Sequence, residues 1–155
     1  AARHKVDHAI AVTSCTTGLH LALVAMGIGP GNEVVVPAFT WVASANAVLH
    51  SGATPIFADV DPLTFNISVE RMAEKITDKT RAVMPVHLFG LPADMDAIMD
   101  IARRHDLIVI EDCATAHFAE YKGRLAGTIG VQGQVGDFVD SGSDFGEHFS
   151  GVHGH

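Results

Sequence analysis

Short segments rich in Val, Ile and Ala alternate with longer amphipathic segments over residues 8–112. The short segments predict strands, and the longer ones predict helices. The predicted strands are His8–Thr13, Glu33–Val36, Pro55–Asp59, Arg81–Val86 and Leu107–Glu111. The predicted helices are Thr16–Met26, Thr40–His50, Val69–Ile76 and Asp94–His105. This alternation indicates an α/β fold with three α/β/α layers and a mainly parallel sheet, whose strands are apolar on both faces because helices cover both.

The pattern changes after about Gly130. Residues 131–155 contain six glycines and no Lys or Arg, and they show neither helical nor strand periodicity. We therefore expect residues 1–130 to form the domain. Residues 131–155 are expected to form a glycine-rich tail that is poorly ordered or lies outside the fold.

Composition narrows the class of protein. The chain has 155 residues, of which 48% are hydrophobic, as for one domain of ordinary size. It has no apolar run near the roughly 20 residues of a membrane helix and no signal-peptide pattern, so we expect a soluble, cytoplasmic protein without a membrane partner. The net charge of −8 argues against a nucleic-acid partner. Two cysteines, Cys15 and Cys113, are too few for a disulfide scaffold.

Candidate binding residues follow the predicted strands, where open α/β sheets bind their ligands. In "TSCTTGLHLAL" the hydroxyl residues Ser14, Thr16 and Thr17 lie at the start of a predicted helix. This arrangement predicts a phosphate site. An ordinary helix N-cap explains the same residues. Trp41, the only tryptophan, opens the next helix, where its indole would stack on a flat ring or pack in the core.

In the stretch "IVIEDCATAHFAEYKG" an apolar predicted strand is followed by two carboxylates, Glu111 and Asp112. A buried Asp112 needs a partner, and a protonated ring nitrogen would provide one. A salt bridge to an arginine and a helix cap are the alternatives. Taken together, a phosphate site, a stacking ring and a carboxylate for a ring nitrogen indicate pyridoxal 5'-phosphate (PLP).

The chain resembles the DegT-type (StrS-like) sugar aminotransferases, PLP-dependent enzymes of fold type I. The resemblance covers about residues 8–130. It rests on "SCTTGLHLALVAMGIGPGNEVVVPAFTWVASANAVLHSGATPIFADVDPLTFNI", "AVMPVHLFGLPADMDAIMDIARRHDLIVIEDCATAH" and "EYKGRLAGTIG". It implies the core of the family's large domain. In that domain Thr16 and Thr17 hold the cofactor phosphate, Trp41 stacks on its ring, and Asp112 binds the ring nitrogen and keeps it protonated.

Two residues depart from the family pattern close to this site. Thr115 stands where the family has a glutamine that touches the cofactor's ring oxygen, and Phe118 stands in place of a glycine. The resemblance implies that Thr115 belongs to the cofactor site with a shorter side chain. His87, in "PVHLFG", matches a segment near the active site, and its role is open between substrate contact and structure.

The resemblance also implies an activity, the transfer of an amino group from an amino acid such as glutamate to a nucleotide-linked keto sugar. Such reactions serve polysaccharide or antibiotic-sugar biosynthesis, and family members are typically dimers. These enzymes hold PLP through a lysine, but the last lysine here is Lys122, in a segment that resembles a surface turn. We therefore expect a partial large domain, truncated at both ends, with no catalytic lysine and weak or no activity.

Three alternatives to this activity remain open. The chain could be a PLP-dependent sugar dehydratase, which uses a histidine in place of the lysine. It could be a non-catalytic remnant that associates with a partner chain. Residues of the tail could also form a metal site, for which the candidates are Asp144, Glu147, His148, His153 and His155.

Overall fold

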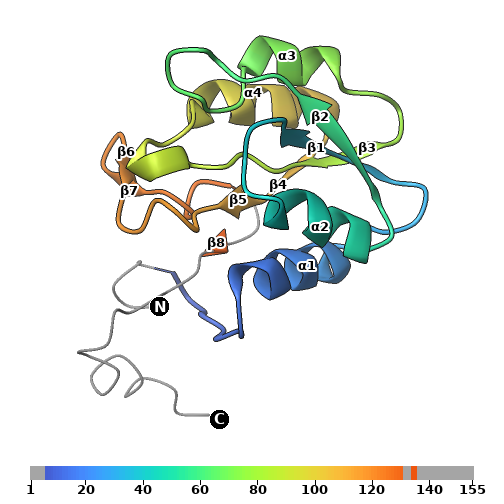
Figure 1. The fold of residues 1–155 in the computed structure, drawn as a ribbon, viewed down its shortest axis with the longest axis horizontal. Coiled ribbons are helices and arrows are strands. Elements are labelled where there is room, and N and C mark those ends of the chain that lie inside the picture. The colour runs from blue at the N-terminus through green and yellow to red at the C-terminus, as the bar shows by residue number, and fades with distance from the viewer. Residues whose placement is uncertain (1–5, 131–133, 136–155) are drawn as a thin grey trace.

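A parallel sheet forms the centre of the molecule, here a computed structural model that describes residues 6–130 and the backbone of residues 134–135. The strand order is β2-β1-β3-β4 (Figure 1). The strands are β1 (Glu33–Pro37), β2 (Thr54–Ala58), β3 (Thr80–Val83) and β4 (Ile108–Val109). This order places β2 at one edge of the sheet and the Asp112 segment at the opposite side.

Two short strands next to β4 form a separate two-stranded sheet. β5 (Glu111–Asp112) follows β4 after a single residue, and Asp112 forms a parallel bridge with Val86. β8 (Gln134–Val135) pairs with β5 in parallel. Apart from these two residues, the predicted tail at 131–155 lies outside the described part of the chain, and so do its candidate metal ligands and histidines.

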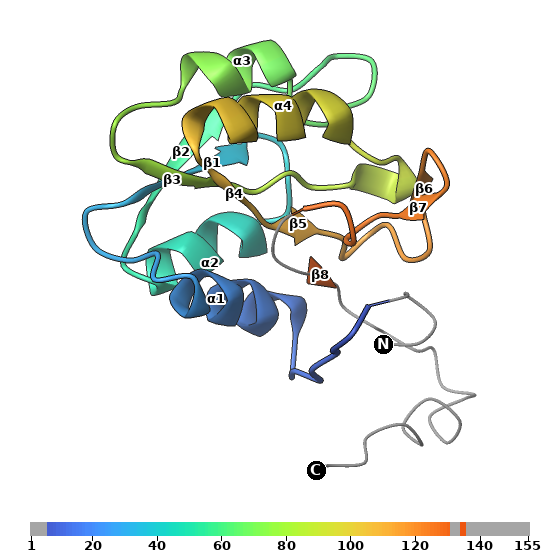
Figure 2. The same ribbon diagram turned by 180° about the vertical axis from the view of Figure 1, so that it is seen from behind.

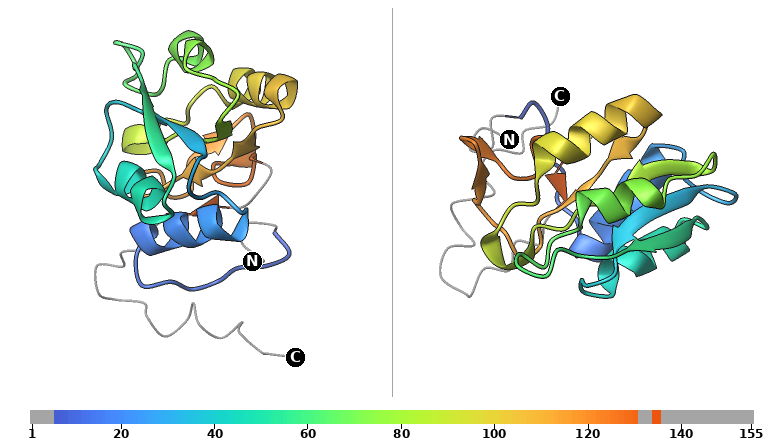
Figure 3. Two further views of the ribbon diagram at one scale, coloured as in Figure 1. Left: turned by 90° about the vertical axis from the view of Figure 1, so that its right-hand side faces the viewer. Right: turned by 90° about the horizontal axis from the view of Figure 1, so that it is seen from above.

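Four helices cover the sheet, two on each face (Figures 1 and 2). The pair α1 (Cys15–Ala25) and α2 (Ala43–His50) covers one face. The pair α3 (Val69–Glu74) and α4 (Met95–His105) covers the other. The left view of Figure 3 likewise shows strands between the two pairs. The predicted three-layer α/β architecture is therefore confirmed.

The alternation of side chains along β1 shows why its sequence is apolar throughout. Val34 and Val36 belong to the core cluster formed with α1 and α2, whereas Val35 belongs to the cluster formed with α3 and α4. All three side chains are fully buried. Successive residues of a strand point to opposite faces, so a strand covered on both sides must be apolar at every position.

Side-chain caps fix where three of the helices begin. Ser14 caps α1, Ser68 caps α3 and Asp94 caps α4, and each accepts a hydrogen bond from the backbone N–H three residues later. These caps satisfy N–H groups that have no partner inside the helix. α1 and α2 both begin at the side of the sheet where the parallel strands have their carboxyl ends, and Asp112 lies on the same side.

The strand predicted at His8–Thr13 is wrong. These residues are exposed and form no strand, and Ile10 is 85% exposed. An apolar alternation forms a strand only where a neighbouring strand supplies hydrogen bonds, and no strand in the described ranges pairs with this segment. The sequence patterns did not predict the 3-10 helix η2 (Leu88–Gly90), the hairpin of β6 (Glu120–Tyr121) and β7 (Arg124–Leu125), or the strand β8 in the expected tail. No helix of the described residues is long and apolar enough to cross a membrane.

Candidate functional site

Asp112 ends β5 with its carboxylate buried, and the residue is 4% exposed. Its Oδ2 accepts a hydrogen bond of 2.8 Å from the hydroxyl of Ser44, in the first turn of α2. Its Oδ1 accepts one of 3.1 Å from the N–H of Ala114 and one of 3.6 Å from the thiol of Cys15, the first residue of α1. The carboxylate therefore lies between the starts of two helices.

The charge of Asp112 is met by neutral donors and helix termini. None of the ion pairs among the described residues includes Asp112. The starts of α1 and α2 bring the positive ends of two helix dipoles toward it. A buried carboxylate without a cationic partner is costly, so this site favours a cationic ligand group. The alternative of an arginine salt bridge is therefore wrong for the described residues, whereas the bond from Ala114 does make Asp112 part of a local turn.

The start of α1 carries the predicted phosphate-binding hydroxyls. Ser14 is the N-cap and accepts a hydrogen bond of 3.2 Å from the N–H of Thr17, as the capping alternative expected. The hydroxyl of Thr17 lies 3.0 Å from that of Ser14 and 3.3 Å from that of Thr13. The half-buried Thr16 has no side-chain hydrogen bond within residues 6–130. Phosphate binding by Thr16 and Thr17 stays a prediction.

Trp41 precedes α2 and is 79% exposed, so the alternative of a core tryptophan is wrong. Its carbonyl accepts a hydrogen bond of 3.3 Å from the N–H of Ser44, the residue that also donates to Asp112. The structure thus brings Trp41, Asp112 and the start of α1 to one edge of the sheet. The stacking of Trp41 on a cofactor ring stays a prediction.

Thr115 connects the Asp112 segment to the neighbouring loop. Its hydroxyl donates to the carbonyl of His87 across 3.1 Å and accepts from the N–H of Phe89 across 3.3 Å. Asn66 holds the same loop from the other side, since its amide donates to the carbonyl of Leu91 and accepts from the N–H of Leu88. The contact of Thr115 with a cofactor oxygen stays a prediction.

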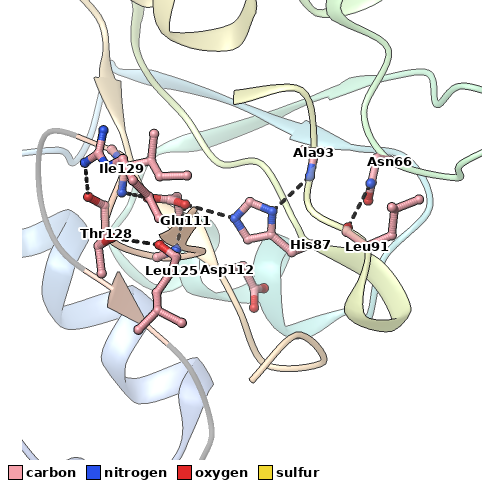
Figure 4. A network of polar contacts seen from close by, with 12 residues as sticks. Asn66, His87, Leu91, Ala93, Glu111, Asp112, Leu125, Thr128 and Ile129 are labelled. Atoms are coloured by element: carbon pink, nitrogen blue, oxygen red, sulfur yellow. Dashed lines mark hydrogen bonds and ion pairs between the residues drawn. The ribbon is translucent and has the colours of Figure 1, made fainter. Parts of the chain in front are cut away.

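His87 and Glu111 form a buried pair on the opposite side of β5 from the Asp112 carboxylate (Figure 4). Figure 4 shows Glu111 directed toward His87 and the carboxylate of Asp112 pointing away from both. Nδ1 of His87 accepts from the N–H of Ala93 across 3.0 Å, and Nε2 lies 3.0 Å from Oε2 of Glu111. A nitrogen that accepts carries no proton, so His87 is neutral and donates from Nε2. His87, whose role the sequence left open, has a structural role here.

Glu111 holds the loop that follows β7. Its carboxylate oxygens also accept hydrogen bonds of 2.6–2.8 Å from three backbone N–H groups, those of Gly127, Ile129 and Gly130. Burial by itself would raise the pKa of the Glu111 carboxyl. The hydrogen bond from His87 and those from the backbone outweigh burial, so the pKa is lowered. Gly130 must be a glycine because a Cβ there would lie 2.7 Å from the carbonyl oxygen of Val109.

One buried group has the residue types of a metal centre. The ligand atoms of His87, Glu111 and Cys113 lie within 4.8 Å of one another. Both ring nitrogens of His87 and both oxygens of Glu111 already take part in hydrogen bonds. Burial and the charges of Glu111 and Asp112 raise the pKa of the Cys113 thiol, so it is not the thiolate that a metal would require. This group is therefore a polar network of the fold.

The sequence patterns predicted neither the bond of Ser44 to Asp112 nor the bonds of Glu111 to the backbone. Ser44 was detectable, because it shares a helix face with Ala47 and Val48, and all three are buried. A serine on an apolar helix face requires a polar partner. The backbone partners of Glu111 lie 16–19 residues downstream and His87 lies 24 residues upstream, so they form no local motif that a sequence pattern would reveal.

The chain is similar to a large group of known proteins. A family model described as the DegT/DnrJ/EryC1/StrS aminotransferase family matches residues 1–138, eight residues past the expected boundary at residue 130. The GDP-perosamine synthase of Caulobacter vibrioides is 56% identical over 125 residues, which are 81% of this chain and 34% of that protein.

Solved structures agree with this match. An aminotransferase from Psychrobacter cryohalolentis is 50% identical with a TM-score of 0.80, and the match covers 82% of this chain and 32% of that one. DesV of S. venezuelae, solved in complex with a ketimine intermediate, is 46% identical with a TM-score of 0.80 and coverages of 81% and 34%. The chain thus spans about a third of the length of the relatives that it matches.

Proposed function

The chain belongs to the DegT/DnrJ/EryC1/StrS aminotransferase family, and from this premise we propose that it forms the PLP-binding part of a nucleotide-sugar aminotransferase. The amino group would pass from an amino acid such as glutamate to a keto sugar attached to a nucleotide. The relative named GDP-perosamine synthase supports a nucleotide-linked sugar as the acceptor.

The main support for this proposal is the environment of the Asp112 carboxylate. Its carboxylate is buried, has no cationic partner among the described residues, and lies beside two helix starts and close to the exposed Trp41. Bound PLP supplies a protonated ring nitrogen and a ring that accepts electrons from the substrate. Asp112 would hold the proton on that nitrogen, because a carboxylate stabilises a cation at hydrogen-bond distance.

The other residues of the site would position the cofactor. Thr16 and Thr17, at the start of α1, would bind the phosphate with their hydroxyls and with the positive end of the helix. The indole of Trp41 would cover one face of the ring and exclude water from it. Thr16 and Thr17 lie on α1, which Ser14 caps, and Trp41 lies just before α2, which is bonded to Asp112 through Ser44.

We further propose that these 155 residues by themselves bind PLP without covalent attachment and are weakly active or inactive. Three lysines lie in the described part of the chain, and each has a place away from Asp112. Lys122 pairs with Asp96 and lies over the ring of Tyr121. Lys79 adjoins the start of β1, at the opposite end of the sheet, and Lys75 follows α3.

Self-association is part of the same proposal. Leu21 and Val24 of α1 and Leu49 of α2 are half exposed on the outside of the helix pair. Side chains of this kind that gather on one helical layer favour contact with another protein surface. Sedimentation velocity should show a dimer or larger species, and Leu21→Glu, which places a charge in that layer, should shift the protein toward the monomer. A monomer at all concentrations would contradict this part of the proposal.

Titration with PLP tests the cofactor site directly. Trp41 is the only tryptophan, so quenching of its fluorescence reports on a ring that binds beside it. Asp112→Asn should weaken PLP binding by about tenfold or more, because a charged hydrogen bond is lost. The matched control is Asp78→Asn, at an exposed position of the loop before β3. Equal PLP affinity in the two variants would contradict the proposal.

Two further measurements test the remaining parts of the proposal. Borohydride treatment of the PLP complex, followed by mass spectrometry, should leave every lysine unmodified, and a labelled lysine would contradict non-covalent binding. Saturation-transfer NMR with GDP-linked and UDP-linked hexoses tests the acceptor class. Signals from both the sugar and the nucleotide protons would support it, and no transfer from either compound would count against it.

A further inference from the structure

We infer that Ser44 is a positioning residue that fixes the carboxylate of Asp112 for a cofactor ring. This inference rests on the proposed PLP site, and it assigns a role to a residue that would not itself touch the cofactor. Ser44 is fully buried in the first turn of α2, where its side chain faces Asp112 and not solvent.

The hydroxyl of Ser44 has one proton and three oxygen neighbours. These are Oδ2 of Asp112 at 2.8 Å, Oγ1 of Thr40 at 3.1 Å and the carbonyl oxygen of Trp41 at 3.4 Å. The shortest contact is to the only charged acceptor, and charge-assisted hydrogen bonds are the strongest of the three types. The proton of Ser44 therefore goes to Asp112, and Thr40 donates to Ser44.

The two oxygens of Asp112 are held in different ways. Oδ1 accepts from the backbone N–H of Ala114 and from the thiol of Cys15, which is a weak donor. Ser44 provides the one hydrogen bond to Oδ2 within the described residues. Without that bond, only the hydrogen bonds to Oδ1 would hold the carboxylate, and the group could rotate around that oxygen. The hydroxyl of Ser44 therefore sets the plane of the carboxylate.

Ser44 also connects the carboxylate to the turn that carries the indole. Its backbone N–H donates to the carbonyl of Trp41 across 3.3 Å, while its side chain donates to Asp112. A ligand held by both residues would require the indole face and the carboxylate plane to keep a fixed relation. Ser44, in the first turn of α2, maintains that relation. A serine that only capped the helix would not connect these two residues.

The test is a double-mutant cycle on PLP affinity, measured by quenching of Trp41 fluorescence. Ser44→Ala should weaken PLP binding by about tenfold, the usual effect of one hydrogen bond to a charged group. Ser44→Thr, which keeps the hydroxyl, should restore most of the affinity. The matched control is Ser51→Ala at the other end of α2, where a hydroxyl donates to the carbonyl of Val48 across 2.8 Å. This control should bind PLP with unchanged affinity.

The cycle separates a positioning role from a structural one. If Ser44 acts through Asp112, Ser44→Ala should change affinity by less than about twofold in the Asp112→Asn background. An equal tenfold loss in both backgrounds would overturn the inference, and so would no loss in either. If Asp112→Asn leaves PLP affinity unchanged, the proposed function fails and not only the role of Ser44.

Folding of the variants is checked by urea unfolding. If Ser44→Ala does not fold, Ser44→Cys retains the size of the side chain with a weaker donor. Its PLP affinity should then lie below that of the unmodified chain by several-fold, and full affinity would overturn the inference.

Discussion

Nε2 of His87 donates to Oε2 of Glu111 across 3.0 Å, inside a core where neither side chain has any exposed surface. Glu111 directly precedes Asp112 on β5, yet the two carboxylates point to opposite sides of this strand and bind different segments. Glu111 faces the loop after β7, and Asp112 faces α1 and α2.

Glu111→Gln should lower the free energy of unfolding by about 3 kcal/mol, because a buried charge that accepts four hydrogen bonds is lost. The amide group of glutamine would also point donor hydrogens at N–H groups that need an acceptor. Urea unfolding measures the change, and Glu120→Gln, at an exposed position of β6, is the matched control. A loss equal to that of the control would show that the Glu111 bonds add nothing to stability.

The stability of the fold should fall in acid through Glu111. Its folded-state pKa is lowered, so its contribution is fully present above the unfolded-state pKa of about 4.3 and is lost as the pH falls through the folded-state pKa. The difference in unfolding free energy between the unmodified chain and Glu111→Gln should therefore shrink over the acid range below the unfolded-state pKa of about 4.3. A difference that stays constant over this range would contradict the lowered pKa.

Phe89→Gly should stabilise the fold relative to Phe89→Ala by about 1 kcal/mol. Phe89 has a left-handed backbone with φ of 53°, a conformation that glycine adopts without strain, and the residue is 76% exposed. The alanine variant removes the ring but keeps the strained backbone, so the difference between the two variants isolates the strain. Thermal unfolding of both provides the measurement, and an alanine variant at least as stable as the glycine variant would refute this account.

Cys113 should not react with a thiol reagent in the folded protein at about pH 8. Burial raises the pKa of this thiol, and the charges of Glu111 and Asp112 raise it further. Only the thiolate attacks such reagents, so the residue should become labelled after unfolding in urea. Alkylation followed by peptide mass spectrometry identifies the modified cysteine, and rapid labelling of folded Cys113 would indicate a more open core.

Sequence patterns were sufficient for the sheet and its helices. Val34, Val35 and Val36 identify β1 because a strand between two helical layers is apolar at each position. The helix that ends in Arg103, Arg104 and His105 has its cations at the negative end of its dipole, which is typical of the last turn of a helix. These signals are local, so they can be detected in a single sequence.

The remaining features depend on contacts between distant segments. The apolar pattern at His8–Thr13 has no neighbouring strand in the described ranges to pair with, which a sequence does not show. The alignment of Ser44 with Asp112 joins residues 68 positions apart. The sequence indicated that a buried Asp112 needs a hydrogen-bond or charged partner. Which groups donate to its carboxylate is visible only in the tertiary structure.

The adjacency of Glu111 and Asp112 also constrains how this protein can change. Because strand side chains alternate, inserting one residue between Val109 and Ile110, or deleting Ile110, would exchange the two carboxylates between the faces of the sheet. Asp112 would then meet the neutral imidazole of His87, and Glu111 would meet Ser44. An engineer who replaces the loop after β7 or redesigns the surroundings of Asp112 must therefore preserve the spacing of this strand, residue for residue.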